Sequence, residues 1–134
     1  MKIEITWVRC LTYEDAQDFT GVIYLHEWNG QPFYWGKAEI SHFGGNTRKN
    51  LQGKKVSARY SSGYSHWIKG CLQHGAKLYF GLLEENHKVH INDVENFLIK
   101  KYRTPNNKKS KVSNDVFTHI SHKGTVPECI THSR

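Results

Sequence analysis

The sequence has little cysteine, little proline and no long apolar run. Only three of its 134 residues are cysteine, at positions 10, 71 and 129, and none of them forms a CxxC pair. An odd count without paired spacing argues against a disulfide framework and favours a reducing, cytoplasmic setting. The first ten residues, MKIEITWVRC, are too polar for a signal peptide, and no apolar run approaches transmembrane length. We therefore expect a cytoplasmic protein that does not use a membrane.

Acidic residues are scarce relative to basic ones. Nineteen Lys and Arg stand against 12 Asp and Glu, which gives a formal net charge of +7. The basic residues are clustered, because residues 47–60 contain five and residues 100–111 contain six, with no acid in either segment. Such an excess favours a polyanionic partner, and we expect nucleic acid, with DNA first. The plainer interpretation of the same charge is a solvated basic surface.

The length and patterning predict one domain with a modest core. Of the residues, 37% are hydrophobic and 13% aromatic, which fits a small globular domain better than a disordered chain. The turn dipeptide Asn29-Gly30 between two apolar runs predicts a β-hairpin. Residues 41–55 contain three glycines and little periodicity, which predicts a loop. Strands are predicted over residues 2–11, 21–28, 31–38 and 76–85, with a short edge strand within 116–124.

Two helices are predicted in the second half of the chain. The first covers residues 65–75 and ends at Gly75. Trp67, Ile68, Cys71 and Leu72 are predicted to lie on one face of this helix. The second helix, over residues 92–102, is predicted to be capped by Asn92 and to end before Pro105. Its buried stripe is predicted to consist of Val94, Phe97, Leu98 and Tyr102.

Four motifs, in this order, resemble the GIY-YIG nuclease family. Val22-Ile23-Tyr24 and Tyr34-Trp35-Gly36 stand in the places of its two signature tripeptides, with nine residues between the tyrosines. YWGKA is similar to the YVGKA form of the incision subunit of bacterial nucleotide excision repair. The segment 65–85 resembles the helix-HG-strand segment of phage-type homing endonucleases. VENFLIKKYRTPNN resembles the last family helix, with Glu95 at its metal-binding glutamate and Asn107 at its closing asparagine.

The resemblance spans residues 21–107 of a single domain, 1–134, and leaves 108–134 as a basic C-terminal extension. It implies an α/β fold of the α+β type, with a small central three-stranded, mostly antiparallel sheet flanked by helices. The sequence departs from the family in the first tripeptide, where Val22 replaces a glycine, and at Trp35 in the second. It also departs at the family arginine, because Gly44 and Gly45 occupy the usual spacing.

Two arginines are candidates for that displaced position. Arg59 is followed by Tyr64 and His66 just ahead of the predicted helix, and we favour it for this reason. Arg48 is followed four residues later by Gln52, which cannot act as an acid or base. The choice between Arg48 and Arg59 stays open.

The resemblance also implies a mechanism and a set of catalytic residues. Tyr24 or Tyr34 would deprotonate or orient the attacking water, and Lys37 and Arg59 would hold the phosphate charge. Glu95 would ligate one divalent ion, Mg²⁺ or Mn²⁺, that stabilises the departing 3′ oxygen. Either Tyr64 or His66 would act as a proton shuttle or phosphate ligand. The implied substrate-binding residues are Arg48, Lys54, Lys55, Asn107, Lys108 and Lys109.

The strand register provides a geometric test of this interpretation. An ideal two-residue hairpin loop would pair Tyr24 with Trp35 and leave the two phenols on opposite faces of the sheet. A shift of one residue, from a bulge or a longer loop, would place both phenols on one face. The resemblance therefore predicts that strict two-residue pairing fails in this hairpin.

Simpler interpretations remain for each residue. A tyrosine on a half-buried hairpin is usually a core residue, and an early glutamate in a helix is usually favoured by the helix dipole. The nine histidines show no spacing typical of a zinc site. The leading hypothesis is a stand-alone metal-dependent endonuclease acting on DNA. The alternatives are a binding module that retains the nuclease fold without cutting, and a restriction-type or toxin nuclease active as a homodimer.

Overall fold

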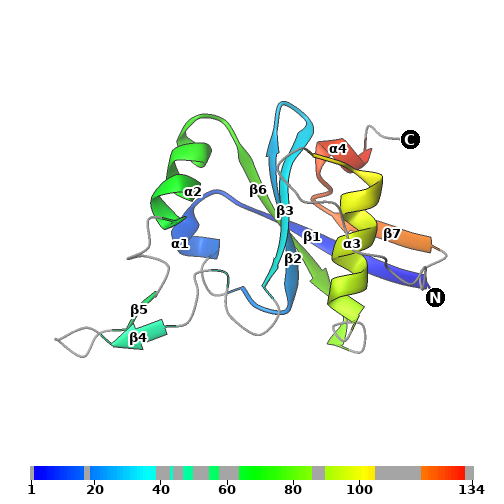
Figure 1. The fold of residues 1–134 in the computed structure, drawn as a ribbon, viewed down its shortest axis with the longest axis horizontal. Coiled ribbons are helices and arrows are strands. Elements are labelled where there is room, and N and C mark those ends of the chain that lie inside the picture. The colour runs from blue at the N-terminus through cyan, green and yellow to red at the C-terminus, as the bar shows by residue number, and fades with distance from the viewer. Residues whose placement is uncertain are drawn as a thin grey trace.

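The computed structural model of the chain describes residues 2–16, 19–38, 43, 47–49, 55–57, 64–85, 90–104 and 119–131 (Figure 1). For residues 47–49, 55–57, 64–66 and 119 it describes the backbone alone. The elements are β1 (Lys2–Cys10), α1 (Tyr13–Ala16), β2 (Val22–Trp28), β3 (Gln31–Ala38), β4 (Thr47–Lys49), β5 (Lys55–Ser57), α2 (Tyr64–Gln73), β6 (Lys77–Leu83), α3 (Ile91–Lys101), β7 (His119–Gly124) and α4 (Glu128–Thr131).

The central sheet has five strands in the order β3-β2-β6-β1-β7. Every neighbouring pair is antiparallel except β1 and β7, which run parallel. The expected α+β class is therefore confirmed, but the expectation of a three-stranded sheet is wrong. The three antiparallel strands β3, β2 and β6 form one half of the sheet. The extra strands arise because β1 pairs with the open edge of β6 and β7 then pairs with β1.

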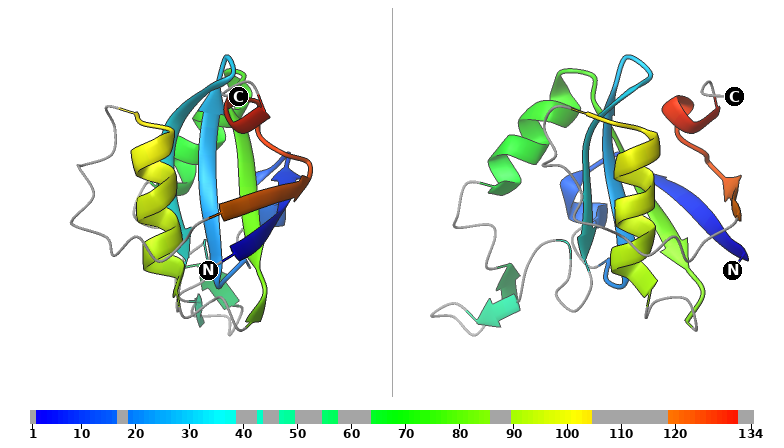
Figure 2. Two further views of the ribbon diagram at one scale, coloured as in Figure 1. Left: turned by 90° about the vertical axis from the view of Figure 1, so that its right-hand side faces the viewer. Right: turned by 45° about the vertical axis from the view of Figure 1, so that its right-hand side comes forward.

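Helices cover both faces of this sheet. On one face, side chains that include Trp7, Trp35 and Tyr79 pack against α3 and α4. On the other face, side chains that include Tyr24 and Phe80 pack in a cluster with residues of α1 and α2. Figure 2 shows α3 lying along the strands, and α1 and α2 next to each other away from it. The hairpin strands β2 and β3 thus contribute to two separate apolar clusters.

The helix boundaries differ slightly from the predicted ones. Helix α3 begins at Ile91, with His90 as its N-cap and no side-chain cap hydrogen bond, so Asn92 lies inside the first turn. The chain leaves α2 through Gly75, whose φ of +95° suits a residue without a Cβ. Residues 41–55 were expected to be a loop, yet residues 47–49 and 55–57 pair as β4 and β5. Strands of three residues are too short to give a periodic sequence signal. Within the described segments, no helix combines the length and hydropathy required to cross a membrane.

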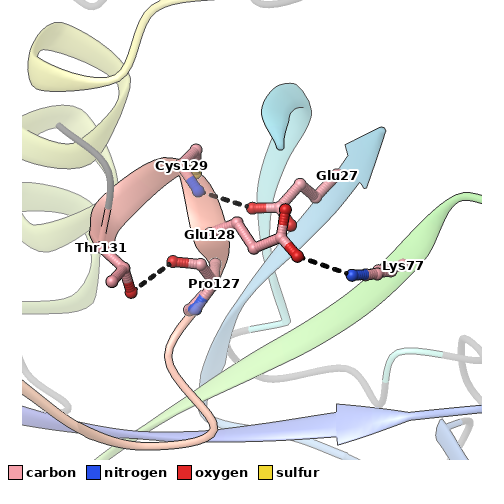
Figure 3. Close-up of polar contacts among 6 residues, drawn as sticks. All are labelled: Glu27, Lys77, Pro127, Glu128, Cys129 and Thr131. Carbon is pink, nitrogen blue, oxygen red and sulfur yellow. Dashed lines mark hydrogen bonds and ion pairs between the residues drawn. The ribbon is translucent and has the colours of Figure 1, made fainter. Parts of the chain in front are cut away.

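The short C-terminal helix α4 is fastened to the sheet by two polar contacts (Figure 3). The buried carboxylate of Glu27 accepts a hydrogen bond of 2.9 Å from the Cys129 backbone N–H. Lys77 donates a hydrogen bond of 2.9 Å to the carboxylate of Glu128. Burial, and then the neighbouring Glu27 charge, raise the pKa of the Cys129 thiol, so this cysteine stays protonated. Residues from the C-terminal part of the chain therefore belong to the same core as the hairpin.

Trp35, the middle residue of the second tripeptide, joins β3 to α3, and its replacement by phenylalanine should destabilise the protein. Its side chain is 1% exposed, its indole N–H donates a hydrogen bond of 2.8 Å to the Tyr102 carbonyl, and its ring contacts Trp7 edge-on. Trp35→Phe would remove the donor and leave a void, which should lower the free energy of unfolding by about 2 kcal/mol or more in urea titrations. The control Trp28→Phe, at a position 48% exposed, should change it by less than about 0.5 kcal/mol. Equal effects at the two positions would contradict this assignment.

Candidate functional site

The β2–β3 hairpin contains a one-residue bulge close to its turn. Asn29 and Gly30 form the turn with positive φ angles of 53° and 73°, and Glu27 lies opposite Pro32. The register then shifts between His26 and Glu27, so that His26 lies opposite Tyr34. The register skips Phe33, which is the bulged residue of β3. The predicted failure of strict two-residue pairing is confirmed.

The bulge is favoured by the preceding residue, Pro32, and by a hydrogen bond from Thr104. Pro32 has no N–H to donate, so its place in the ladder needs one hydrogen bond fewer. The carbonyl of Phe33 accepts a hydrogen bond of 2.9 Å from the hydroxyl of Thr104, a buried residue just after α3. Because unpaired backbone groups next to a bulge need other partners, this contact stabilises the shifted register.

The shift places Tyr24, His26 and Tyr34 on one side of the hairpin, which we call the tyrosine face. The rings of Tyr24 and Tyr34 stack with centroids 6.3 Å apart and planes inclined by 30°. Tyr24 lies directly opposite Gly36 in the ladder, and a Cβ on that glycine would collide with the Tyr24 ring. The glycine of the second tripeptide is thus required by the tyrosine of the first.

The two phenols of the tyrosine face differ in exposure. The Tyr24 side chain is 5% exposed and packs edge-on against Phe43 at 4.8 Å between ring centroids. Tyr34 lies on the edge strand β3 and is half-buried. Tyr34 is therefore the more solvent-accessible phenol of the pair, and its ring stacks on the buried ring of Tyr24.

His26 occupies the centre of the tyrosine face and is fully buried. Its ring lies 5.9 Å from that of Tyr24, 6.3 Å from that of Tyr34 and 5.1 Å from that of Trp67. Neither ring nitrogen has a hydrogen-bond partner among the described residues. Loss of hydration on burial lowers the pKa of His26 to about 4, so the ring is neutral at physiological pH.

Lys37 and Glu95 lie on the other side of the sheet from the tyrosine pair. Strand alternation puts Lys37 on the same side as Trp35, opposite Ile23, whose side chain packs in the α3 cluster. Glu95 is half-buried on α3, the helix that covers this face. Strand β3 is the last strand of the sheet. A site that uses the tyrosine pair together with Lys37 and Glu95 must therefore extend around the outer edge of β3.

The structure fixes the backbone of four further predicted residues. Arg48 lies in β4 opposite Val56, and Lys55 lies in β5 opposite Lys49. Tyr64 and His66 lie in the first turn of α2. The remaining predicted residues, Arg59, Lys54, Asn107, Lys108 and Lys109, lie outside the described part of the chain.

The described part of the chain offers few protein ligands for a divalent ion. No cluster of three or more His, Cys, Asp or Glu side chains there could hold a metal ion. Glu95 supplies one carboxylate. Mg²⁺ suits such a position, because it keeps several waters and commonly binds one or two carboxylates together with substrate phosphate.

A polar pocket of about 410 Å³ lies at the turn end of the hairpin, away from the tyrosine pair. It is bounded by the turn, the end of α3 and the start of α4, and it contains Lys101, Arg103 and Glu128. Neither Tyr24 nor Tyr34 lines this pocket. The candidate site is therefore the tyrosine face, not this pocket.

Sequence reasoning missed three residues of the tyrosine face and its surroundings. His26 follows Tyr24 by two positions, so strand alternation alone could have placed it there. Trp67 was predicted to share one face of α2 with Ile68, yet Trp67 is 40% exposed whereas Ile68 is fully buried. Thr104 holds the bulge across a long sequence separation, and no local pattern signals such a contact.

Comparisons of the chain with protein-family models, with curated proteins and with solved structures found no match. The features available for a functional interpretation are the bulge, the stacked phenols and the position of β3 at the edge of the sheet.

The buried His26 should make stability depend on pH. Its pKa is about 4 in the folded chain against an ordinary 6.5, so between these values the unfolded chain binds more protons. Stability from this residue is complete above pH 6.5 and is lost as the pH falls toward 4, a change of about 3 kcal/mol. In urea titrations from pH 4 to pH 7, His26→Phe should reduce the dependence of the free energy of unfolding on pH. The same exchange at the exposed His74 is the control and should leave that dependence unchanged. An unchanged slope in His26→Phe would contradict the buried, neutral ring.

The contact between Tyr24 and Gly36 should appear as an energetic coupling. Gly36→Ala should lower the free energy of unfolding by about 1–3 kcal/mol, because the new methyl group collides with the Tyr24 ring. In a Tyr24→Ala background the same exchange should cost much less, which a double-mutant cycle measures. Gly70→Ala is the matched control, since a Cβ there meets nothing within 4 Å and the helix should gain stability. Additive effects would show that the two residues do not constrain each other.

Proposed function

We propose that this chain is a metal-dependent endonuclease that hydrolyses phosphodiester bonds in DNA. The observation that carries the proposal is the bulge, which turns Tyr24 and Tyr34 onto one face although a plain two-residue hairpin would separate them. The resemblance of the two tripeptides to the GIY-YIG family required this shift. The three antiparallel strands β3, β2 and β6 correspond to the small sheet that the same resemblance implies.

Tyr34 is the residue that contacts the attacking water. It is half-buried at the free edge of the sheet, whereas Tyr24 is almost completely covered. As phenolate, Tyr34 would accept a proton from water while the water oxygen attacks phosphorus and the bond to the 3′ oxygen breaks. A phenol has an ordinary pKa near 10, so cations near the phosphate are needed to favour its ionised form.

Lys37 and Glu95 lie on the α3 side of β3. Lys37 follows Tyr34 by three positions and would hold a phosphate oxygen at the strand edge, with Arg59 or Arg48 as the second cation. Glu95 would hold one Mg²⁺ together with water and substrate phosphate. When bound, such an ion neutralises charge on the phosphoryl group and on the departing oxygen. The formal charge of +7 favours attraction of DNA to this region.

A second candidate is a nucleic-acid-binding module that retains the fold without cutting. The observation that favours it is the division of the proposed groups between two faces, with the tyrosine pair packed in the α2 cluster and Glu95 on α3. Binding of DNA would then depend on the basic residues alone. The two candidates predict the same binding but different chemistry.

The test is nicking of supercoiled plasmid DNA in the presence of Mg²⁺ or Mn²⁺. Tyr34→Phe should lower the rate by about 100-fold or more, because it removes only the group that exchanges a proton with water. Glu95→Gln should lower it similarly, and EDTA should abolish cutting. The matched controls are Tyr79→Phe, which removes a phenol on the opposite face, and Asp93→Asn, which removes a carboxylate on the same helix.

The assay distinguishes the role of Tyr34 from the endonuclease activity itself. Cutting by Tyr34→Phe at the wild-type rate would exclude the proposed role of that phenol. DNA binding without any cutting at any concentration of either metal would favour the binding module. Equal losses in the controls would indicate that the substitutions act through the fold.

A further inference from the structure

Two aromatic side chains extend the tyrosine face toward solvent. Phe33, the bulged residue, stacks against Trp67 of α2 with ring centroids 5.9 Å apart and planes inclined by 24°. The inner edge of this pair is closed by His26, whose ring meets Trp67 at 70°. Trp67 nevertheless remains 40% exposed, and Phe33 is half-buried. We call Phe33 and Trp67 the aromatic platform.

The platform forms at the bulge. The register skips Phe33 between Pro32 and Tyr34, and the Phe33 ring contacts Trp67 of α2 on the tyrosine side. The Trp67 ring packs at 70° against the fully buried ring of His26, and this contact fixes its orientation. The Trp67 side chain is nevertheless 40% exposed.

Exposure alone does not distinguish Trp67, because Trp28 is 48% exposed as well. The two differ in their surroundings. No ring contact involves Trp28 among the described residues, whereas Trp67 is held by two aromatic neighbours beside Tyr34. A fixed, exposed indole is suited to stack on a flat ring.

We propose that the aromatic platform stacks one unpaired nucleobase of single-stranded DNA. This inference rests on the proposed function and specifies its substrate, which is DNA with an unpaired base next to the phosphate at Tyr34. The formal charge of +7 favours a polyanion as the partner, and stacking on aromatic side chains is how proteins hold single strands without reading sequence. A base inside a duplex has both faces covered by its neighbours and cannot stack in this way.

The experiment measures binding of labelled oligodeoxynucleotides by fluorescence anisotropy in EDTA, so that cutting cannot interfere. The ligands are a single strand, the matching duplex, and the same single strand with abasic sites in place of its bases. The variants are Trp67→Ala, Trp67→Phe and the control Trp28→Ala. Trp67→Ala is expected to fold, because the position is exposed and alanine favours a helix, and circular dichroism checks this.

Trp67→Ala should weaken binding of the single strand about tenfold, and Trp67→Phe should restore most of the loss. Trp28→Ala should leave the affinity within about twofold of wild type. The abasic strand should bind wild type and Trp67→Ala equally, because only phosphate attraction remains. Tryptophan fluorescence should be quenched by the single strand in wild type, and the quenching should be much smaller in Trp67→Ala.

Unchanged binding of the single strand by Trp67→Ala, or equal weakening for single strand, duplex and abasic strand, would overturn the platform. These results are separable from the plasmid assay. Cutting with unchanged binding in Trp67→Ala would leave the endonuclease in place and remove the platform. Base-dependent binding through Trp67 with no cutting in Mg²⁺ or Mn²⁺ would support the platform and contradict the endonuclease.

Discussion

The structure of the candidate site depends on the extra residue at Phe33 in the hairpin. Without it, Tyr24 and Tyr34 would lie on opposite faces. The Thr104 hydroxyl donates a hydrogen bond to the carbonyl of this bulged residue. One contact between β3 and the end of α3 therefore supports both the phenol pair and the aromatic platform.

The position of β3 at the edge of the sheet is the second constraint. Strand β2 has strand neighbours on both sides, whereas β3 is the last strand of the sheet. Tyr34 and Lys37 lie on the two faces of β3. A site of the proposed kind would therefore use groups from both faces of one edge strand.

Local sequence patterns were sufficient for the longer elements, whereas the shared face of Tyr24 and Tyr34 was predicted from the family resemblance and against the plain hairpin pattern. The Asn29-Gly30 turn, the alternation in β1 and the stripe of α3 are short-range signals, and each predicted element was found within a few residues. The five-stranded sheet was missed because the pairing of β7 with β1 joins segments more than a hundred residues apart. The exposure of Trp67 was not predicted, because helix periodicity gives a face but not its width. On that face Ile68 is fully buried and Leu72 is partly buried, whereas Trp67 is 40% exposed.

His26 shows where this chain departs from a packing optimum. A buried ring with two unpaired nitrogens costs about 1–3 kcal/mol relative to an apolar side chain of similar shape. Glu27, its neighbour on the opposite face, uses one carboxylate oxygen to hold α4, which gives its burial a structural purpose. His26 has no such bond within the described residues, and it contacts both phenols and Trp67. Because departures from stable packing concentrate at functional sites, the cost at His26 supports the tyrosine face as the working surface of the protein.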